Sequence, residues 1–302
     1  MTHYDLISRN KQKSVLIIVL FTAFIVGATY IMARGFGFGL GIVGYALIFS
    51  GIMSFASYWW SDKIILSISG AHPATREEYF DFYTVTENLC LGQRMKMPKL
   101  YVIDDDAMNA FATGRDPDHA VVCATTGILG RLKREELEGV IAHELSHVQN
   151  YDIRLMSIVT ILVGLVALLA DWMLRMSMWG GGNRRRDREN GGQLQIIFFV
   201  VGLLLALLSP IIAQLIQLAI SRQREYLADA NGAGITKNPA GLARALEKIS
   251  QDNLPLREAN KATAHLYIEN PFRNAQGSRS WFAGLFDTHP PIAERIKLLR
   301  EM

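Results

Sequence analysis

Two histidines and a glutamate stand at positions where they can act together on one metal ion. The segment from Ala142 to His147 reads AHELSH, and the apolar residues around it recur at three- and four-residue steps, which indicates a helix. Residues four apart share one face of a helix, with Cβ atoms about 5–6 Å apart. His143 and His147 can therefore offer two imidazole nitrogens to one Zn²⁺, and Glu144 beside them can take a proton from the attacking water.

A site of this kind needs a third protein ligand and leaves a fourth position for water. The candidate is Glu225, and Asp229 four residues later shares its helix face. Asp229 can accept a hydrogen bond from the far ring nitrogen of a ligating histidine, which fixes the tautomer of that histidine. The alternative is a surface helix with ordinary scattered charges. Two carboxylates four residues apart favour that alternative when they stand alone, and the preceding HExxH motif reverses the preference.

Several segments, in the same order along nearly the whole chain, resemble the HtpX family of membrane-bound zinc endopeptidases. They are Asn109–Gly114, the HExxH segment, Asn150 with Asp152, Arg224–Asp229, and Thr288–Pro291 followed by Arg295 and Ile296. The resemblance supports one Zn²⁺ per subunit, held by His143, His147 and Glu225, with Glu144 as the catalytic base.

The resemblance also implies roles for residues outside this set. Asp229 and Asp152 are expected to orient the ligands, and His289 and Arg295 to orient the site or the oxyanion. Asn109 and Ala110 are expected to border the substrate groove. Residues alone leave alternatives open: His289 before two prolines is typical of a loop histidine, and the segment around Asn109 is also typical of a plain turn.

Composition places the chain among membrane proteins. Half of its 302 residues are hydrophobic (50%), and the apolar residues are concentrated in blocks. The formal net charge is only +3, and no basic pattern interleaved with aromatic residues suggests nucleic acid. The two cysteines, Cys90 and Cys123, stand in no C-x-x-C motif, so we expect buried apolar residues in a reducing compartment.

The first two apolar blocks, Val15–Ala33 and Gly35–Trp60, are free of charged residues. Each is long enough to cross a hydrocarbon core of about 30 Å. The first is too long for the core of a cleaved signal peptide, and the second follows after only Arg34. We therefore expect two spanning helices, anchored at the membrane surface by aromatic residues at the end of the second block. Basic residues before Val15 favour a cytoplasmic N-terminus and a catalytic domain that faces the cytoplasm.

Two further apolar blocks, Leu155–Leu174 and Gln193–Ser221, are candidates for a second hairpin. A hairpin returns the chain to one side of the membrane, as a metal shared by His143, His147 and Glu225 requires. It would also place the arginine-rich segment 175–192 outside, against the positive-inside rule. Either the second pair does not span fully, or the first pair dictates its orientation; the sequence leaves both open.

Between these blocks the sequence predicts a soluble domain in two parts. His72–Met97 reads as a helix, and Lys99–Ile103 and His119–Thr125 as two strands of a small sheet. An extended peptide can add to the exposed edge of such a sheet beside the metal. After the Glu225 helix we expect a break at Asn231–Gly234, then a helix at Pro239–Gln251 and a final helix that includes Ile296 and Leu299.

The predicted fold class is therefore α+β, mainly α with a small β-sheet, in a multi-pass membrane protein with a zincin-like catalytic domain on one side. Residues 1–60 form an N-terminal transmembrane hairpin, and 61–154 the first part of the protease domain. Residues 155–221 form the second apolar hairpin, and 222–302 the second part of the protease domain.

The predicted function is a zinc metalloendopeptidase of the bacterial inner membrane that degrades misfolded or damaged membrane proteins. Its expected partners are polypeptide substrates and the lipid bilayer, without nucleic acid; no chaperone or protease partner follows from the sequence. The alternatives are a protease for prenylated CAAX tails and an inactive scaffold. The order of the motifs favours the HtpX type, and retention of Glu144 beside a full ligand set speaks against a scaffold.

Overall fold

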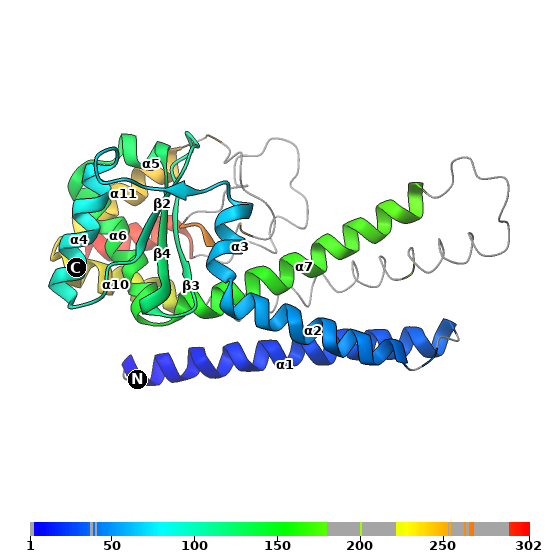
Figure 1. The fold of residues 1–302 in the computed structure, drawn as a ribbon. Helices are drawn as coiled ribbons and strands as arrows, with labels where there is room; N and C mark the ends of the chain where they lie inside the picture. Colours follow the sequence, from blue (N-terminus) through cyan, green and yellow to red (C-terminus); the bar gives the residue numbers. More distant parts are fainter. Residues whose placement is uncertain are drawn as a thin grey trace.

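The computed structural model describes residues 3–36, 39, 41–179, 200, 222–252, 254, 263, 266–268 and 290–302. The long helices α1 (His3–Phe36), α2 (Gly41–Trp59) and α7 (Asp152–Trp179) pack on one another and extend from a domain that contains a small sheet (Figure 1). The prediction of a mainly helical chain with a small sheet is confirmed. The predicted fourth apolar block, apart from Val200, lies outside the described residues.

The sheet consists of β1 (His72–Pro73), β2 (Lys99–Ile103), β3 (Ala110–Gly114) and β4 (Ala120–Thr125). Within the described residues their order is β1-β2-β4-β3, so β3 lies at an edge. β2 and β4 are parallel, whereas β1 and β3 pair antiparallel with their neighbours. Every residue of β4 is buried, as expected for a central strand that is covered on both faces.

Helices cover the two faces of this sheet. Val122 and Ala124 of β4 belong to a core formed with α4 (Phe80–Gln93), α6 (Arg134–Gln149) and α11 (Pro239–Gln251). Val121 and Cys123, which point to the opposite face, pack with α3 (Ser61–Ile68) and the start of α7. Successive residues of a strand point to opposite faces, so one strand serves both cores.

The remaining described elements complete the domain. They are η1 (Pro117–His119), α5 (Thr126–Arg131), α10 (Arg222–Thr236) and α13 (Ile292–Arg300). The predicted helix at Pro239–Gln251 is confirmed, and α13 includes the predicted residues of the final helix.

Two local predictions were wrong, and one open alternative is excluded. The helix expected over His72–Met97 begins only at Phe80, because His72 and Pro73 form the edge strand β1 and the amide of Ala74 continues this pairing by donating to Leu100 O. The plain turn left open for the segment around Asn109 is excluded, because Ala110–Gly114 is a strand; its small residues have little β-propensity, but it is buried between β4 and the helices. The break expected at Asn231–Gly234 is absent, and α10 continues to Thr236.

Among the described residues, two helical stretches have the length and composition to cross a membrane, Ile7–Tyr30 and Gly41–Trp59. The second has an inverted burial pattern. Its buried side chains are serines, Ser50, Ser54 and Ser57, whereas Tyr45 is 75% and Ile48 61% exposed. Large apolar side chains outside and small polar ones against neighbouring helices are what a lipid environment selects.

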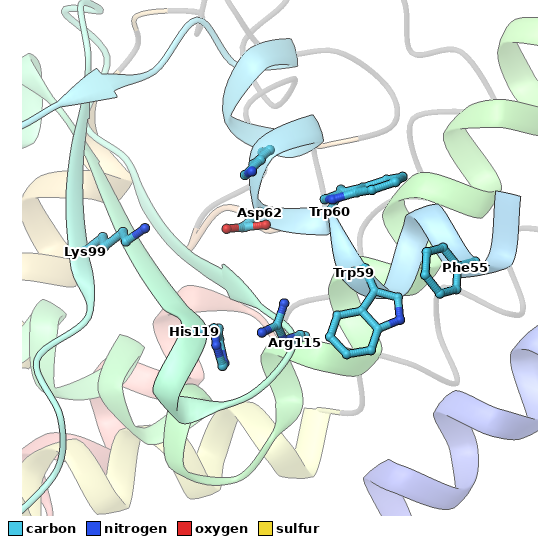
Figure 2. A pocket seen from close by; sticks show the side chains of 8 residues that line it. Phe55, Trp59, Trp60, Asp62, Lys99, Arg115 and His119 are labelled. Carbon is cyan, nitrogen blue, oxygen red and sulfur yellow. The ribbon is translucent and has the colours of Figure 1, made fainter. Parts of the chain in front are cut away.

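Aromatic and basic side chains gather where α2 meets the domain. The guanidinium of Arg115 lies 4.7 Å from the centre of the Trp59 ring, and that of Arg154 lies 5.4 Å from the Tyr58 ring. We call Tyr58, Trp59, Trp60, Arg115 and Arg154 the junction belt. Its tryptophans and Arg115 line a cavity with side chains from α2, α3, β2 and η1 (Figure 2): Phe55, Asp62, Lys63, Lys99 and His119. Such a mixture is typical of the membrane–water interface.

Candidate metal centre

Helix α6 carries the HExxH residues through the centre of the domain. Twelve of its residues are buried, among them His143, Glu144 and His147. The start of the helix is held by Glu136, whose Oε2 accepts hydrogen bonds from the backbone amide of Lys133 at 2.7 Å and from Nζ of Lys248 at 2.7 Å. Because Lys248 belongs to α11, this contact fixes the entry of α6 against a neighbouring helix.

Helix α10 lies against α6 at unusually close range. A Cβ on Gly232 would lie 3.1 Å from the backbone nitrogen of His143, which is tighter than most real Cβ contacts. Beside it, Nδ2 of Asn231 donates to Oγ of Ser146 at 3.1 Å. The residues that suggested a helix break therefore serve helix packing, because glycine lets the two backbones approach. This packing brings Glu225 to the histidines.

His143, His147 and Glu225 form a compact triangle of buried ligand atoms. The two Nε2 atoms are 3.2 Å apart. Glu225 Oε2 lies 3.7 Å from Nε2 of His143, and Oε1 lies 3.5 Å from Nε2 of His147. In a tetrahedral site with Zn–N and Zn–O bonds of about 2.0–2.2 Å, two ligand atoms are separated by about 3.3–3.6 Å. The donor types and their spacing therefore fit a divalent metal such as zinc.

Asp229 and Arg295 form the outer shell of His143. Nδ1 of His143 lies 2.9 Å from Oδ1 of Asp229. Arg295 on α13, which is 1% exposed, donates Nη2 to the same Oδ1 at 2.7 Å and Nε to Oδ2 at 2.8 Å. Burial by itself would raise the pKa of Asp229, but the charge and hydrogen bonds of Arg295 outweigh burial and lower this pKa to about 2. Asp229 is therefore an anion that can accept a hydrogen bond from Nδ1 of His143.

Asp152 has the corresponding place beside His147, with Oδ2 3.0 Å from Nδ1. Burial lowers the pKa of His147, but the hydrogen bond that its Nδ1 donates to Asp152 and the negative charges of Glu225 and Glu144 raise it to about 9. Both histidines thus have a carboxylate at Nδ1, which holds a proton on that nitrogen and leaves Nε2 to face Glu225. The raised pKa of His147 favours a second proton, on Nε2, in the metal-free site, and a metal that binds there replaces this proton.

The other predicted residues are placed as follows. Asn109 and Ala110 stand at the start of edge strand β3; Oδ1 of Asn109 accepts from the amide of Ala110, and Ala110 O accepts from the amide of Ile268. Glu144 is buried on α6 between the histidines, 3% exposed. Arg295 joins the site through Asp229. His289 lies outside the described residues.

Two residues that contact Asp152 behind the ligands were not predicted from the sequence. Nη1 of Arg224 lies 3.3 Å from Oδ1 of Asp152, and Nδ2 of Asn10 donates to the same oxygen at 2.6 Å. Arg224 stands directly before the candidate ligand Glu225, in a segment that resembles the HtpX family. Its position in the sequence could therefore have indicated that it lies near the metal site. Asn10 stands 142 positions from Asp152 in a basic N-terminal segment, and no sequence pattern marks it.

Comparison with known protein families matches residues 83–302 to peptidase family M48, a range that includes the whole ligand triangle and Glu144. The chain belongs to peptidase family M48. Within this family it is similar to proteins named protease HtpX homolog. The homolog of Caldanaerobacter subterraneus subsp. tengcongensis is 45% identical over 302 residues, covering 100% of this chain and 98% of the relative. The homolog of Streptococcus uberis is 41% identical over 303 residues, covering 99% of each chain.

A solved structure has a similar fold. The crystal structure of S. mikatae Ste24p matches this M48 peptidase with a TM-score of 0.50 and 19% sequence identity. The match covers 94% of this chain and 65% of the Ste24p chain, so the chain spans less than two thirds of that protein. At this identity the comparison concerns the fold alone. The family assignment itself confirms the predicted resemblance to HtpX and identifies a membrane-associated metallopeptidase.

Proposed function

We propose that this M48 peptidase uses zinc to cleave peptide bonds within misfolded or damaged membrane proteins at the bacterial inner membrane. The observation that carries the proposal is the ligand triangle of His143, His147 and Glu225, with Glu144 on the same helix α6 and a carboxylate behind each histidine. Each histidine is held from outside by its carboxylate, as a preorganised site requires.

His143, His147 and Glu225 would hold the zinc ion. When bound, zinc supplies Lewis acidity that activates water and polarises the scissile carbonyl. The two outer carboxylates, Asp229 and Asp152, hold the imidazole rings in orientation and keep the protons at Nδ1. Both histidines and Glu225 are at most 5% exposed, which limits competition from bulk water.

Glu144 is the proposed general base. Its carboxylate accepts a proton from the attacking water and delivers it to the leaving nitrogen of the peptide, a role that contributes about 10²–10⁴-fold to a rate. The negative charge of Glu144 acts on His147, so this carboxylate lies near the proposed metal centre, and it is not one of the three ligands of the triangle.

The edge strand β3 is the proposed substrate platform. β3 contacts α6, so a peptide that pairs with this strand lies next to the metal centre. Ile268 already donates to Ala110 O. An incoming peptide therefore pairs further along β3 or replaces Ile268 at this carbonyl.

The membrane location explains the proposed substrate class. The start of α1 contacts Asp152, and α2 ends at the domain. These contacts support an arrangement in which the N-terminus and the metal centre lie on the same side of the membrane. Arg9, Lys11 and Lys13 favour the cytoplasmic side. In this arrangement residues 1–60 and 155–221 are membrane hairpins, and 61–154 and 222–302 together form the protease domain beside the bilayer.

Digestion of an unfolded reporter protein by the detergent-purified full chain tests the proposal. We expect cleavage by wild type, loss of cleavage after chelation, and recovery with added Zn²⁺. Glu144→Gln should retain about the zinc content of wild type but lose at least 10²-fold in turnover. Glu225→Gln should instead lose zinc.

The matched control is Glu138→Gln, which removes a carboxylate from the same helix where it contacts Arg134 rather than the metal centre. It should cleave like wild type. Normal turnover by Glu144→Gln would exclude Glu144 as the general base. If zinc-loaded wild type ignores the unfolded reporter but cleaves a farnesylated peptide, the enzyme is a prenyl-protein protease instead.

A further inference from the structure

A buried amide on α1 reaches the outer shell of the metal centre. Asn10 is 4% exposed, and its Nδ2 donates to Asn150 O at 2.9 Å and to Asp152 Oδ1 at 2.6 Å. Its Oδ1 lies 3.5 Å from Nη1 of Arg224. Asn150 and Asp152 follow the HExxH helix, and Arg224 precedes Glu225. One side chain of α1 thus contacts the chain beside both metal-binding segments.

Asp152 connects Asn10 to a ligand. Oδ2 of Asp152 lies 3.0 Å from Nδ1 of His147, while Oδ1 accepts from Asn10 and lies 3.3 Å from Arg224. Asp152 is 1% exposed, so water does not supply these contacts. A carboxylate with fixed donors at both oxygens has one orientation, and the imidazole bound to it is oriented with it.

We propose that Asn10 is a positioning residue for the metal: it holds Asp152 so that Nε2 of His147 faces Glu225. The inference rests on the proposed function, because it takes His147 as a ligand. It also gives α1 a second role. The helix that is a candidate membrane span, Ile7–Tyr30, contributes a polar side chain to the metal centre and is not only an anchor.

The alternative is a structural hydrogen bond that holds α1 to the domain and has no influence on the metal. The two differ in what they change. A structural bond affects unfolding, whereas a positioning bond changes metal affinity and ligand geometry in protein that is still folded. Because Arg224 remains as a partner of Asp152, loss of Asn10 should loosen the carboxylate rather than release it. The expected effect is therefore about tenfold in zinc affinity, the lower end for residues behind a metal ligand.

The experiment compares full-length wild type, Asn10→Ala, Asn10→Asp and the control Gln12→Ala, all purified in detergent. Asn10→Asp keeps the size of the side chain but removes the donor and places a carboxylate beside Asp152. Gln12 is exposed on the same helix. The readouts are the zinc dissociation constant by competition with a chromophoric chelator, the visible absorption spectrum with Co²⁺, and thermal unfolding of the metal-free protein.

We expect zinc to bind about tenfold more weakly to Asn10→Ala, with a shifted Co²⁺ spectrum, while Gln12→Ala matches wild type in both. Folded Asn10 variants whose zinc affinity and Co²⁺ spectrum equal those of Gln12→Ala overturn the inference. Failure of both Asn10 variants to fold also overturns it, because Asn10 would then serve the fold. If wild type itself binds no zinc and cleaves nothing, the proposed function fails instead; if wild type binds and cleaves while the variants keep their affinity, only the role of Asn10 fails.

Discussion

At the scale of single residues, the buried side chains of the site form a chain of contacts in which basic and acidic groups alternate. Arg295 neutralises Asp229, Asp229 accepts from His143, and Glu225 faces both histidines from the opposite side. A buried ion is tolerated only where partners replace its lost hydration. Removing one member therefore leaves an uncompensated charge next to the metal ligands, with consequences for folding as well as for metal binding.

Arg295→Ala tests this pairing. Breaking a buried pair by removing one partner costs about 3–5 kcal/mol, so we expect a loss of that size in the free energy of unfolding. The control is Arg300→Ala on the same helix, whose partner is Glu247 at the surface; an exposed pair contributes about 1 kcal/mol or less. Denaturant unfolding measures both. Equal losses for the two variants would mean that Asp229 does not depend on Arg295.

At the scale of elements, two features fix the position of α6. Side chains make contacts at its first turn, and glycines let the neighbouring helices α10 and α11 approach closely. Glu136 receives hydrogen bonds from the start of its own helix and from α11. Gly139 lies so close to α11 that a Cβ there would be 2.7 Å from the backbone of Leu242. Both features determine where His143 and His147 stand relative to α10.

Glu136 should make stability depend on pH. Burial raises its pKa, but the hydrogen bonds from Lys248 and the Lys133 amide outweigh burial, so the folded pKa lies below the ordinary value of 4.5. The stabilisation is present above that value and is lost as pH falls through the lower, folded pKa. Glu136→Gln should therefore lower the free energy of unfolding by about 1–3 kcal/mol at pH 7, and the difference should shrink in acid.

Urea unfolding of wild type and Glu136→Gln between pH 7 and pH 3 (about the range in which glutamates titrate) checks this expectation. Glu135→Gln is the control, because its carboxylate pairs with Arg244 at the surface. A difference between wild type and Glu136→Gln that stays constant with pH would exclude the ionic contribution of Glu136.

Gly139→Ala should disturb the contact between α6 and α11. The added methyl group would meet backbone atoms of Leu242, and overpacking of this kind costs about 1–3 kcal/mol. Gly234→Ala on α10 is the control, because a Cβ there meets nothing within 4 Å and alanine is the better helix former. Thermal unfolding should therefore show a lower Tm for the first variant and an equal or higher Tm for the second. The reverse order would mean that α11 can move away from α6 without cost.

At the scale of the whole molecule, the apolar helices and the protease domain meet at the junction belt. α2 exposes large apolar side chains along its length and ends at Trp59, where Arg115 stacks on its ring. The lining of the adjacent cavity mixes aromatic and charged side chains, as Figure 2 shows. These features fit the proposed arrangement, in which the membrane surface lies at the end of α2.

Cysteine labelling tests the proposed orientation, in which the protease domain lies on the cytoplasmic side of the membrane. Gly39→Cys lies between α1 and α2, and Lys63→Cys lies beyond the junction belt; both positions are exposed. The native Cys90 and Cys123 are buried, so they contribute little labelling. With intact cells, a membrane-impermeant maleimide should label Gly39→Cys but label Lys63→Cys only after lysis. The opposite pattern would place the protease domain outside the cytoplasm.

The sequence by itself determined those parts of the site whose partners lie within one helix. A spacing of four places His143 with His147, and Glu225 with Asp229, whatever the rest of the chain does. Charge-free blocks likewise indicate membrane helices, because length and hydropathy are local properties. The candidate ligand residues and the first two apolar helices were therefore open to prediction.

Only the tertiary structure decided how these pieces meet. It pairs Asp229 with His143 and Asp152 with His147, and it brings Asn10 from the N-terminal helix to the second pair. It also keeps α10 helical through Gly232, since close packing on α6 uses the glycine that locally suggests a break. The physical reason is the same in each case: burial and hydrogen bonding between residues distant in sequence outweigh local propensity.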